Sequence, residues 1–270
     1  MTRMNRNSLA PLFLLLLSLL LQACSPSEQE AGVTEVAETG TAVMVEVTEN
    51  EEVPDISGFW TVSFGQDPES SALFQKLPDD AVFIDDAGGG ELAEGDYGGL
   101  QLSEAALEEI RNYDFDYEFT AEYSCQAPTS AFYMQAPFPM EIDQGRDLIV
   151  FRMEYFDMRR IIFLDGREHP GPDHPHTKNG HSIGHWEGDE LVVDTTHLQE
   201  GTFMNNGFNH SEDIHMTERF KVSEDGNILW LLQVYEDPAV FAGKAARLMS
   251  WRKEPGEFIY PYECDPSFGR

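Results

Sequence analysis

From residue 55 onward, short runs of alternating apolar and polar residues are separated by tight turns rich in Gly and Asp. Such alternation places the apolar side chains of a strand on one face. Turns of this composition join consecutive antiparallel strands. The chain is therefore predicted to be mainly β, an antiparallel meander that forms a barrel or a strongly curved sandwich. The predicted strands are 55–62, 139–142, 148–155, 160–164, 183–186, 191–196, 214–222, 228–235, 247–252 and 258–262.

Three segments depart from this β pattern. Ser103 is a good helix N-cap followed by acidic and apolar residues, which predicts one short helix near 103–112. Residues 79–99 are rich in Gly, Asp and Glu and are predicted to form a surface loop. Residues 165–182 contain three prolines among glycines, which predicts a long irregular connection.

The N-terminus has the layout of a secretory signal. Arg3 and Arg6 precede an apolar run over 9–21, and a small residue stands directly before Cys24. A membrane-spanning helix needs ~20 apolar residues, so this run is too short to be one. The three-part layout predicts a signal peptide over 1–23.

The end of this signal, Leu21-Gln22-Ala23-Cys24, resembles the lipobox of bacterial lipoproteins. In that class the cysteine is lipidated and becomes the new N-terminus, so the resemblance implies lipidation of Cys24. In such lipoproteins an Asp after the cysteine favours the inner membrane, whereas this chain has Ser25. The resemblance therefore implies an exported protein anchored by its lipid to the outer membrane, on the periplasmic or the cell-surface side.

The segment that follows has the composition of a linker. Residues 25–54 include eight glutamates and neither a basic nor an aromatic residue. Such a segment cannot bury enough apolar surface to offset its ordering entropy. We therefore expect an acidic disordered tether over 24–54. No second linker interrupts the remaining chain, so 55–270 is predicted to be a single β-rich domain.

The composition is strongly acidic, with 49 Asp and Glu against 17 Lys and Arg and a formal net charge of -32 at pH 7. Such a charge repels nucleic acid and anionic lipid headgroups, so nucleic acid is excluded as a partner. Dense carboxylates also keep a protein soluble in a salty medium. The charge therefore says more about the surroundings of the protein than about a specific ligand.

Three cysteines are present. If Cys24 carries lipid, Cys125 and Cys264 remain as one pair in an oxidising compartment. Their simplest use is a disulfide that joins the middle of the chain to its C-terminal end. Two unpaired buried thiols are the alternative.

All eight histidines lie between residues 169 and 215. His174-Pro175-His176 places two imidazoles on one side of an extended segment, and these two are the candidate metal ligands. The histidine density makes a divalent metal one candidate cofactor, although the sequence does not identify a cofactor. However, no spacing in this region matches a strong zinc signature such as His-Glu-x-x-His on a helix. An acid–base site, or histidine used simply as a weak base in an acidic protein, remains an alternative explanation.

The predicted strand 214–222 carries one carboxylate on its apolar face. Its even positions are Ile, Met, Glu218, Phe and Val, whereas its odd positions are polar. An unpaired buried charge is too costly to persist. Either an arginine pairs with Glu218, or its pKa rises and it becomes a candidate acid or base. The candidate arginines are Arg152, Arg159 and Arg160, and the candidate catalytic partners of Glu218 are His181 and His215.

The stretch 180–195, Gly-His-Ser-Ile-Gly-His-Trp-Glu-Gly-Asp-Glu-Leu-Val-Val-Asp-Thr, resembles a family of secreted bacterial proteins of unassigned function. The family shares the pattern G-x-S-x-G-x-W-E-G-D-x-L-V-V-D-T, and the resemblance implies no catalytic roles. Where its members have Arg before the Trp, this chain has His185. His185 is therefore a poor candidate for an essential residue.

The opening Gly58-Phe59-Trp60 resembles the first strand of lipocalins, which are ligand-binding β-barrels. This likeness implies a lipocalin-like barrel that binds a small apolar or amphipathic molecule, which is the first functional hypothesis. The second is a hydrolase- or isomerase-type enzyme that uses Glu218 and a nearby histidine. The third is a metal-binding protein that uses the histidines of 169–215. The candidate ligand-binding residues are Arg160, Asp194, His210 and Trp186.

Overall fold

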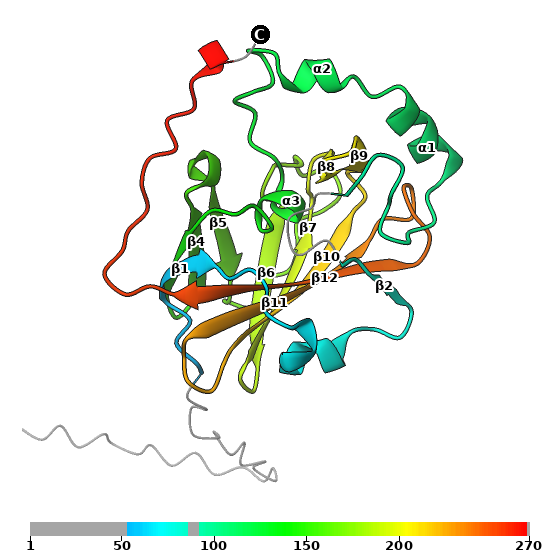
Figure 1. Cartoon of the computed structure of the whole chain (residues 1–270). Coiled ribbons are helices and arrows are strands. Elements are labelled where there is room, and N and C mark those ends of the chain that lie inside the picture. Colours follow the sequence, from blue (N-terminus) through cyan, green and yellow to red (C-terminus); the bar gives the residue numbers. More distant parts are fainter. Residues whose placement is uncertain (1–52, 86–91, 269–270) are drawn as a thin grey trace, which may run out of the picture. The chain divides into compact units, whose positions relative to one another are not determined.

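A computed structural model of the chain describes residues 53–85 and 92–268 (Figure 1). The predicted signal peptide over 1–23 and the predicted lipidation site Cys24 lie outside the described residues. So does the predicted tether over 24–54, apart from its last two residues. None of the helices in the described part of the chain is long and apolar enough to cross a membrane.

Nine strands form a closed barrel. In the order of their pairing they are β1 (Gly58–Val62), β3 (Met140–Gln144), β4 (Leu148–Met153), β5 (Arg159–Phe163), β6 (His181–Glu187), β7 (Glu190–Thr196), β10 (His215–Val222), β11 (Ile228–Glu236) and β12 (Lys244–Lys253). The barrel closes because β1 pairs with β3 on one side and with β12 on the other. The predicted fold class, mainly β with a lipocalin-like barrel, is confirmed.

Within the nine-stranded barrel, the prediction of an antiparallel meander is correct for most pairs and wrong for one. β5 and β6 are parallel, with Ile162 opposite Ser182. The cause is the long connection between them, predicted as irregular, which brings the chain back to the end of the barrel where β5 began. Parallel neighbours always require such a crossover.

Two further strand predictions are corrected. The supposed surface loop 79–99 contains β2 (Ala81–Phe83), which pairs in parallel with β12. The run 258–262 forms no strand, because its backbone pairs with side chains, as when Tyr260 N–H donates to Glu154. A separate two-stranded sheet of β8 (Gly201–Met204) and β9 (Phe208–His210) was not predicted.

The predicted helix is present as α1 (Glu104–Arg111). The Ser103 hydroxyl accepts a hydrogen bond from the amide of Ala106, which caps the helix as its sequence indicated. The other described helices are shorter than two turns. They are α2 (Phe115–Glu118), α3 (Ser130–Tyr133) and the 3-10 turns Pro68–Ser70, Ala72–Lys76, Tyr155–Asp157 and Pro266–Phe268.

The barrel interior is an apolar core to which the strands contribute alternate residues. On β10, Met216, Glu218 and Phe220 are fully buried, whereas the residues between them are partly exposed. Tyr133, at the end of α3, and the following Met134 belong to the same buried cluster as Phe220, so the end of α3 packs against the inside of the barrel. Of the inward positions predicted on 214–222, all but the partly buried Val222 are therefore buried.

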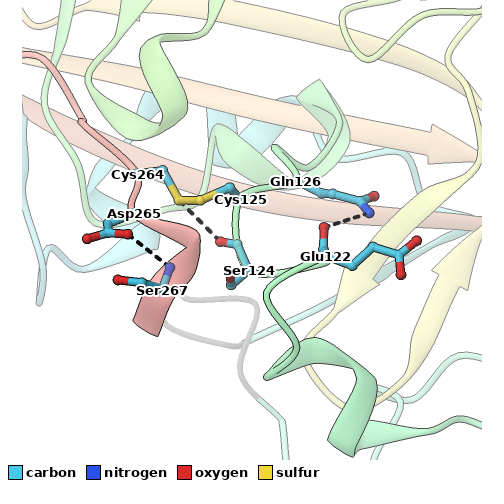
Figure 2. The surroundings of a disulfide bond; sticks show 7 residues. All are labelled: Glu122, Ser124, Cys125, Gln126, Cys264, Asp265 and Ser267. Atoms are coloured by element: carbon cyan, nitrogen blue, oxygen red, sulfur yellow. Dashed lines mark hydrogen bonds between the residues drawn. A yellow bond between two sulfur atoms is a disulfide. The ribbon is translucent and has the colours of Figure 1, made fainter. Parts of the chain in front are cut away.

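The predicted disulfide between Cys125 and Cys264 is confirmed, with their Cα atoms 5.7 Å apart (Figure 2). It joins the segment after α2 to the C-terminal segment that follows β12. The bond spans 139 residues of sequence. In the chain-entropy account, closing a loop of this length stabilises the fold by about 5 kcal/mol.

Candidate functional site

Glu218 points into the barrel, as predicted, and pairs with Arg160 on β5. Both side chains are 0% exposed. The Arg160 Nη1 donates to Glu218 Oε1 at 3.0 Å, and Nη2 forms the second, shorter contact with Oε2. Of the three candidate arginines, the structure selects Arg160 because only its side chain lies inside the barrel on β5.

Neighbouring strands complete the hydrogen bonding of this ion pair. Arg160 donates to Ser182 Oγ at 3.1 Å and to Thr195 Oγ1 at 2.8 Å. Gln233 Nε2 donates to Glu218 Oε1 at 2.9 Å. The pair is thus bidentate, hydrogen-bonded and closed off from solvent, which is the arrangement of a structural ion pair.

The structure does not bring Glu218 together with either candidate histidine. His215 lies three residues before Glu218 on β10, and an odd spacing on a strand places two side chains on opposite faces. His181 likewise lies on the outer face of β6, next to the inward Ser182. The predicted joint action of Glu218 with His181 or His215 is therefore wrong, because the barrel wall separates them.

The two histidines instead belong to a cluster on the outer face of β6, β7 and β10. We call His169, His181, Asp194 and His215 the histidine–aspartate cluster. The Asp194 carboxylate lies 2.7 Å from His169 Nε2 through one oxygen and 2.7 Å from His215 Nε2 through the other. His169 Nδ1 lies 2.9 Å from His181 Nδ1. Sequence reasoning missed His169 as a member of the site, although it lies in the histidine-rich segment.

The hydrogen bonds of this cluster fix its tautomers. A carboxylate only accepts hydrogen bonds, so His169 and His215 both donate to Asp194 through Nε2. In this tautomer of His169, Nδ1 is an acceptor, which the Nδ1–H of His181 at 2.9 Å and the Thr196 hydroxyl at 3.1 Å can both reach as donors. This leaves the lone pair of His181 on Nε2, where it can take up a proton.

The cluster also shifts the pKa values of its members. The hydrogen bond from His215 to Asp194 raises the pKa of His215. Burial opposes ionisation of Asp194, yet the hydrogen bonds from His215 and His169 lower its pKa. Burial, together with the neighbouring His169, lowers the pKa of His181. The cluster therefore favours the protonated form of His215 beside the ionised form of Asp194, and it makes His181 a weaker base than an ordinary histidine.

The predicted metal ligands, His174 and His176, differ in their surroundings. His174 is exposed, whereas His176 Nδ1 lies 2.9 Å from the carbonyl oxygen of Leu198. Both rings pack near the ring of His197, at centroid distances of 5.7 and 5.2 Å. The part of the chain that the structure describes contains no group of three or more His, Cys, Asp or Glu side chains that could hold a metal ion.

Two other candidate ligand-binding residues lie apart from this cluster. His210 on β9 is buried, and its Nε2 lies 2.7 Å from Thr129 Oγ1. Burial lowers the pKa of His210 to about 4, so the ring is neutral near pH 7. Trp186 on β6 is partly buried against the barrel core. Both arrangements are those of structural residues.

A pocket opens where the barrel closes. One edge of β12 pairs first with β2 and then with β1. The β2 side ends at Ala246, whose carbonyl oxygen accepts a hydrogen bond from the Ile84 amide. The β1 side begins at Ser250, whose carbonyl oxygen accepts a hydrogen bond from the Ser63 amide. Neither the β1 pairing nor the β2 pairing extends to Leu248 and Met249 on this edge. A pocket of about 310 Å³ lies at this gap between β1 and β2, and we call it the seam pocket. Its lining comprises Val62, Ser63, Phe64, Gly65, Gln66, Asp67, Pro68, Phe83, Ile84, Asp85, Met134, Gln135, Trp230, Leu248, Met249, Ser250 and Trp251.

Two buried polar atoms of the residues lining this mainly apolar pocket have no hydrogen-bond partner among the described residues. They are Gln135 Oε1 and Trp251 Nε1, and each of the two residues is only 1% exposed. Sequence reasoning missed this pocket. One available signal was Gln135 itself, a polar residue at the end of the buried stretch Ala-Phe-Tyr-Met.

No protein-family model matches this chain, and no curated protein is significantly similar to it. By its fold and its pocket, the protein belongs to the class of closed β-barrels with a pocket in the barrel wall.

Proposed function

We propose that the protein is an exported lipoprotein, anchored to the outer membrane through Cys24, whose barrel binds a small apolar or amphipathic molecule. The binding site is the seam pocket. The observation that carries the proposal is the seam pocket itself, a cavity of about 310 Å³ in the barrel wall whose lining is mainly apolar.

The energetic argument concerns the apolar lining. Ligand sites combine an apolar lining with a few polar groups that orient the ligand. Trp230, Leu248 and Met249 are among the apolar residues of the seam pocket. A small molecule that binds there would bury its own apolar surface against them, which is favourable by about 25 cal/mol per Å².

The test is to identify what co-purifies with the protein. The full chain is isolated from membranes, and its small molecules are extracted and analysed by mass spectrometry. Leu248→Trp fills the pocket, whereas Ile161→Trp adds the same ring on the exposed outer face of β5 and is the matched control. We expect one compound in the wild type and in Ile161→Trp that is lost in Leu248→Trp. Identical extracts from all three proteins would contradict the proposal.

A second candidate function is acid–base catalysis of the hydrolase or isomerase type. The observation that favours it is the histidine–aspartate cluster, in which Asp194 orients His169 and His169 orients His181. A base held in this way takes protons through the Nε2 of His181. Glu218 has no part in it.

This second function is tested with 4-nitrophenyl acetate as a simple ester. General acid–base catalysis contributes about 10²-fold or more. His181→Ala should then lower the rate by that factor, whereas His185→Ala, which removes an exposed histidine from the same strand, should not. Equal rates in the two variants would contradict a catalytic role for the cluster.

A further inference from the structure

We propose that Lys178 is a reactive amine in a second pocket of the protein, where it captures small neutral aldehydes by forming an imine. The described linings of this pocket and of the seam pocket share no residue. The inference therefore concerns a separate site and does not depend on the function proposed above.

The second pocket lies between the region of α2 and the two-stranded sheet of β8 and β9. We call it the tyrosine pocket, because Tyr113, Tyr117 and Tyr123 belong to its lining. Gln126, which follows Cys125 of the disulfide (Figure 2), also lines it. Its volume of about 260 Å³ is roughly twice that of a cavity that holds benzene, so it suits a ligand with one ring. The ring centroids of Tyr117 and Tyr123 lie 5.3 Å apart, and aromatic side chains of this kind favour a flat apolar ligand.

Lys178 is the basic residue among the described residues that line this pocket. Its backbone carbonyl accepts a hydrogen bond from the amide of Ser130 at 2.8 Å, which fixes the chain beside the start of α3. Its Nζ donates to the carbonyl oxygen of Ala127, another residue of the lining. The amine of Lys178 is therefore held at the wall of the pocket.

Lys178 differs from other lysines of this acidic protein because it forms no ion pair with a described carboxylate. Three of the others pair with Asp or Glu, namely Lys76, Lys221 and Lys244. Partial burial removes water from the Lys178 ammonium and lowers the pKa of this amine, although the net charge of -32 favours protonated lysines. A lysine that is partly desolvated and not paired with a carboxylate is suited to attack a carbonyl group as a free amine.

The reaction needs no partner besides the aldehyde. The lone pair of the Lys178 nitrogen adds to the carbonyl carbon, and the carbonyl oxygen takes up a proton while the nitrogen loses one. The resulting carbinolamine expels this oxygen as water, and a carbon–nitrogen double bond forms. One aldehyde and one amine thus give one imine and one water, with no change of oxidation state.

The charge of the pocket favours a neutral ligand. Glu200 is the acidic residue of the described lining, and burial together with the nearby Glu109 and Glu212 raises its pKa. An anionic ligand would be repelled by these carboxylates and by the net negative charge of the protein. It would also stabilise the protonated form of Lys178, which cannot add to a carbonyl group.

The experiment traps the imine with benzaldehyde as the probe. The full chain is incubated with benzaldehyde and sodium cyanoborohydride, which reduces an imine to a stable secondary amine, and peptide mass spectrometry gives the labelling rate at each lysine. We expect Lys178 to be labelled at least about 10-fold faster than Lys244, because the pocket holds the aldehyde beside the amine. The rate at Lys178 should level off as the benzaldehyde concentration rises.

Two pairs of variants locate the reaction. Lys178→Met should remove the fast labelling, whereas Lys244→Met should keep it. Tyr117→Ala opens the pocket and should slow labelling of Lys178 about 10-fold. Tyr260→Ala removes an exposed tyrosine outside the described lining and should leave the rate unchanged. Circular dichroism checks that the variants fold, and if Lys178→Met does not fold, the wild-type rates at the individual lysines decide alone.

A charged analogue, 4-formylbenzoate, tests the preference for a neutral ligand. Measured relative to Lys244, it should label Lys178 more slowly than benzaldehyde does. Faster labelling by 4-formylbenzoate would show that a protonated Lys178 attracts anions, which overturns the proposal. Equal benzaldehyde rates at Lys178 and Lys244 would overturn it as well. So would a rate at Lys178 that rises in proportion to the benzaldehyde concentration without levelling off, because the aldehyde would then react without binding in the pocket.

Discussion

Glu218 and His215 lie three residues apart on β10 and point to opposite sides of the barrel wall. Glu218 is held inside by Arg160, whereas His215 donates outward to Asp194. The barrel wall thus separates the Arg160–Glu218 ion pair from the histidine–aspartate cluster, although Glu218 and His215 are close in sequence. The inner one stabilises the barrel, and the outer one holds the connection between β5 and β6 through His169.

We predict that Glu218→Leu destabilises the protein by about 3–5 kcal/mol, because it leaves the Arg160 guanidinium buried without its partner. The free energy of unfolding in urea measures this loss. The double variant Arg160→Met and Glu218→Leu should recover most of it, since apolar pairs of similar volume often replace buried ion pairs without loss. A loss below about 1 kcal/mol in the single variant would show that the pair is not closed off as described.

His210 should give the protein a pH-dependent stability. Its folded pKa, about 4, lies below the ordinary 6.5, so between these values the unfolded chain binds a proton that the folded chain does not. The contribution of His210 is therefore complete above pH 6.5 and falls by up to about 3 kcal/mol as the pH drops toward 4.

The measurement is the difference in unfolding free energy between the wild type and His210→Gln as a function of pH. The exposed His185→Gln is the control. We expect the wild type to lose stability more steeply than His210→Gln between pH 6.5 and 4. Parallel curves would mean that His210 is not buried as a neutral ring.

Removal of the disulfide should destabilise the fold without changing its architecture. Cys264→Ser should lower the free energy of unfolding by about 2–5 kcal/mol, since the bond closes a long loop in the unfolded chain. The circular dichroism spectrum should stay that of a β protein, because Cys125 and Cys264 lie outside the barrel strands. Addition of a reductant to the wild type should reproduce the effect, and an unchanged stability would contradict it.

The proposed lipid anchor predicts a change of location. Cys24→Ala should leave the protein in the soluble fraction of the periplasm, and it should incorporate no radiolabelled palmitate. Ser25→Ala keeps the cysteine and should remain in the membrane fraction. Recovery of Cys24→Ala in the outer membrane would show that another part of the chain makes the attachment.

Features that depend on local pattern could be read from the sequence. The alternation along 214–222 placed Glu218 inside, and Ser103 marked the start of α1. Two cysteines left over in a chain predicted to be exported indicated the disulfide. In each case a few neighbouring residues, or a simple pairing rule, carry the information.

Features that depend on distant segments could not be read in this way. The parallel pairing of β5 with β6 follows from the path of the connection between them, which no periodicity encodes. The seam pocket exists because β1 and β2, far apart in sequence, both pair with one edge of β12. Nothing near Trp251 in the sequence indicates that its indole lacks a partner.

The most direct test of the central claim is a calorimetric titration of 1-octanol into the wild type and into Leu248→Trp. The account predicts one saturable site per wild-type molecule and no detectable binding to Leu248→Trp, whose added ring fills the seam pocket. Equal binding isotherms for the two proteins, or no saturable binding to either, would contradict the claim that this barrel binds a small molecule at its seam.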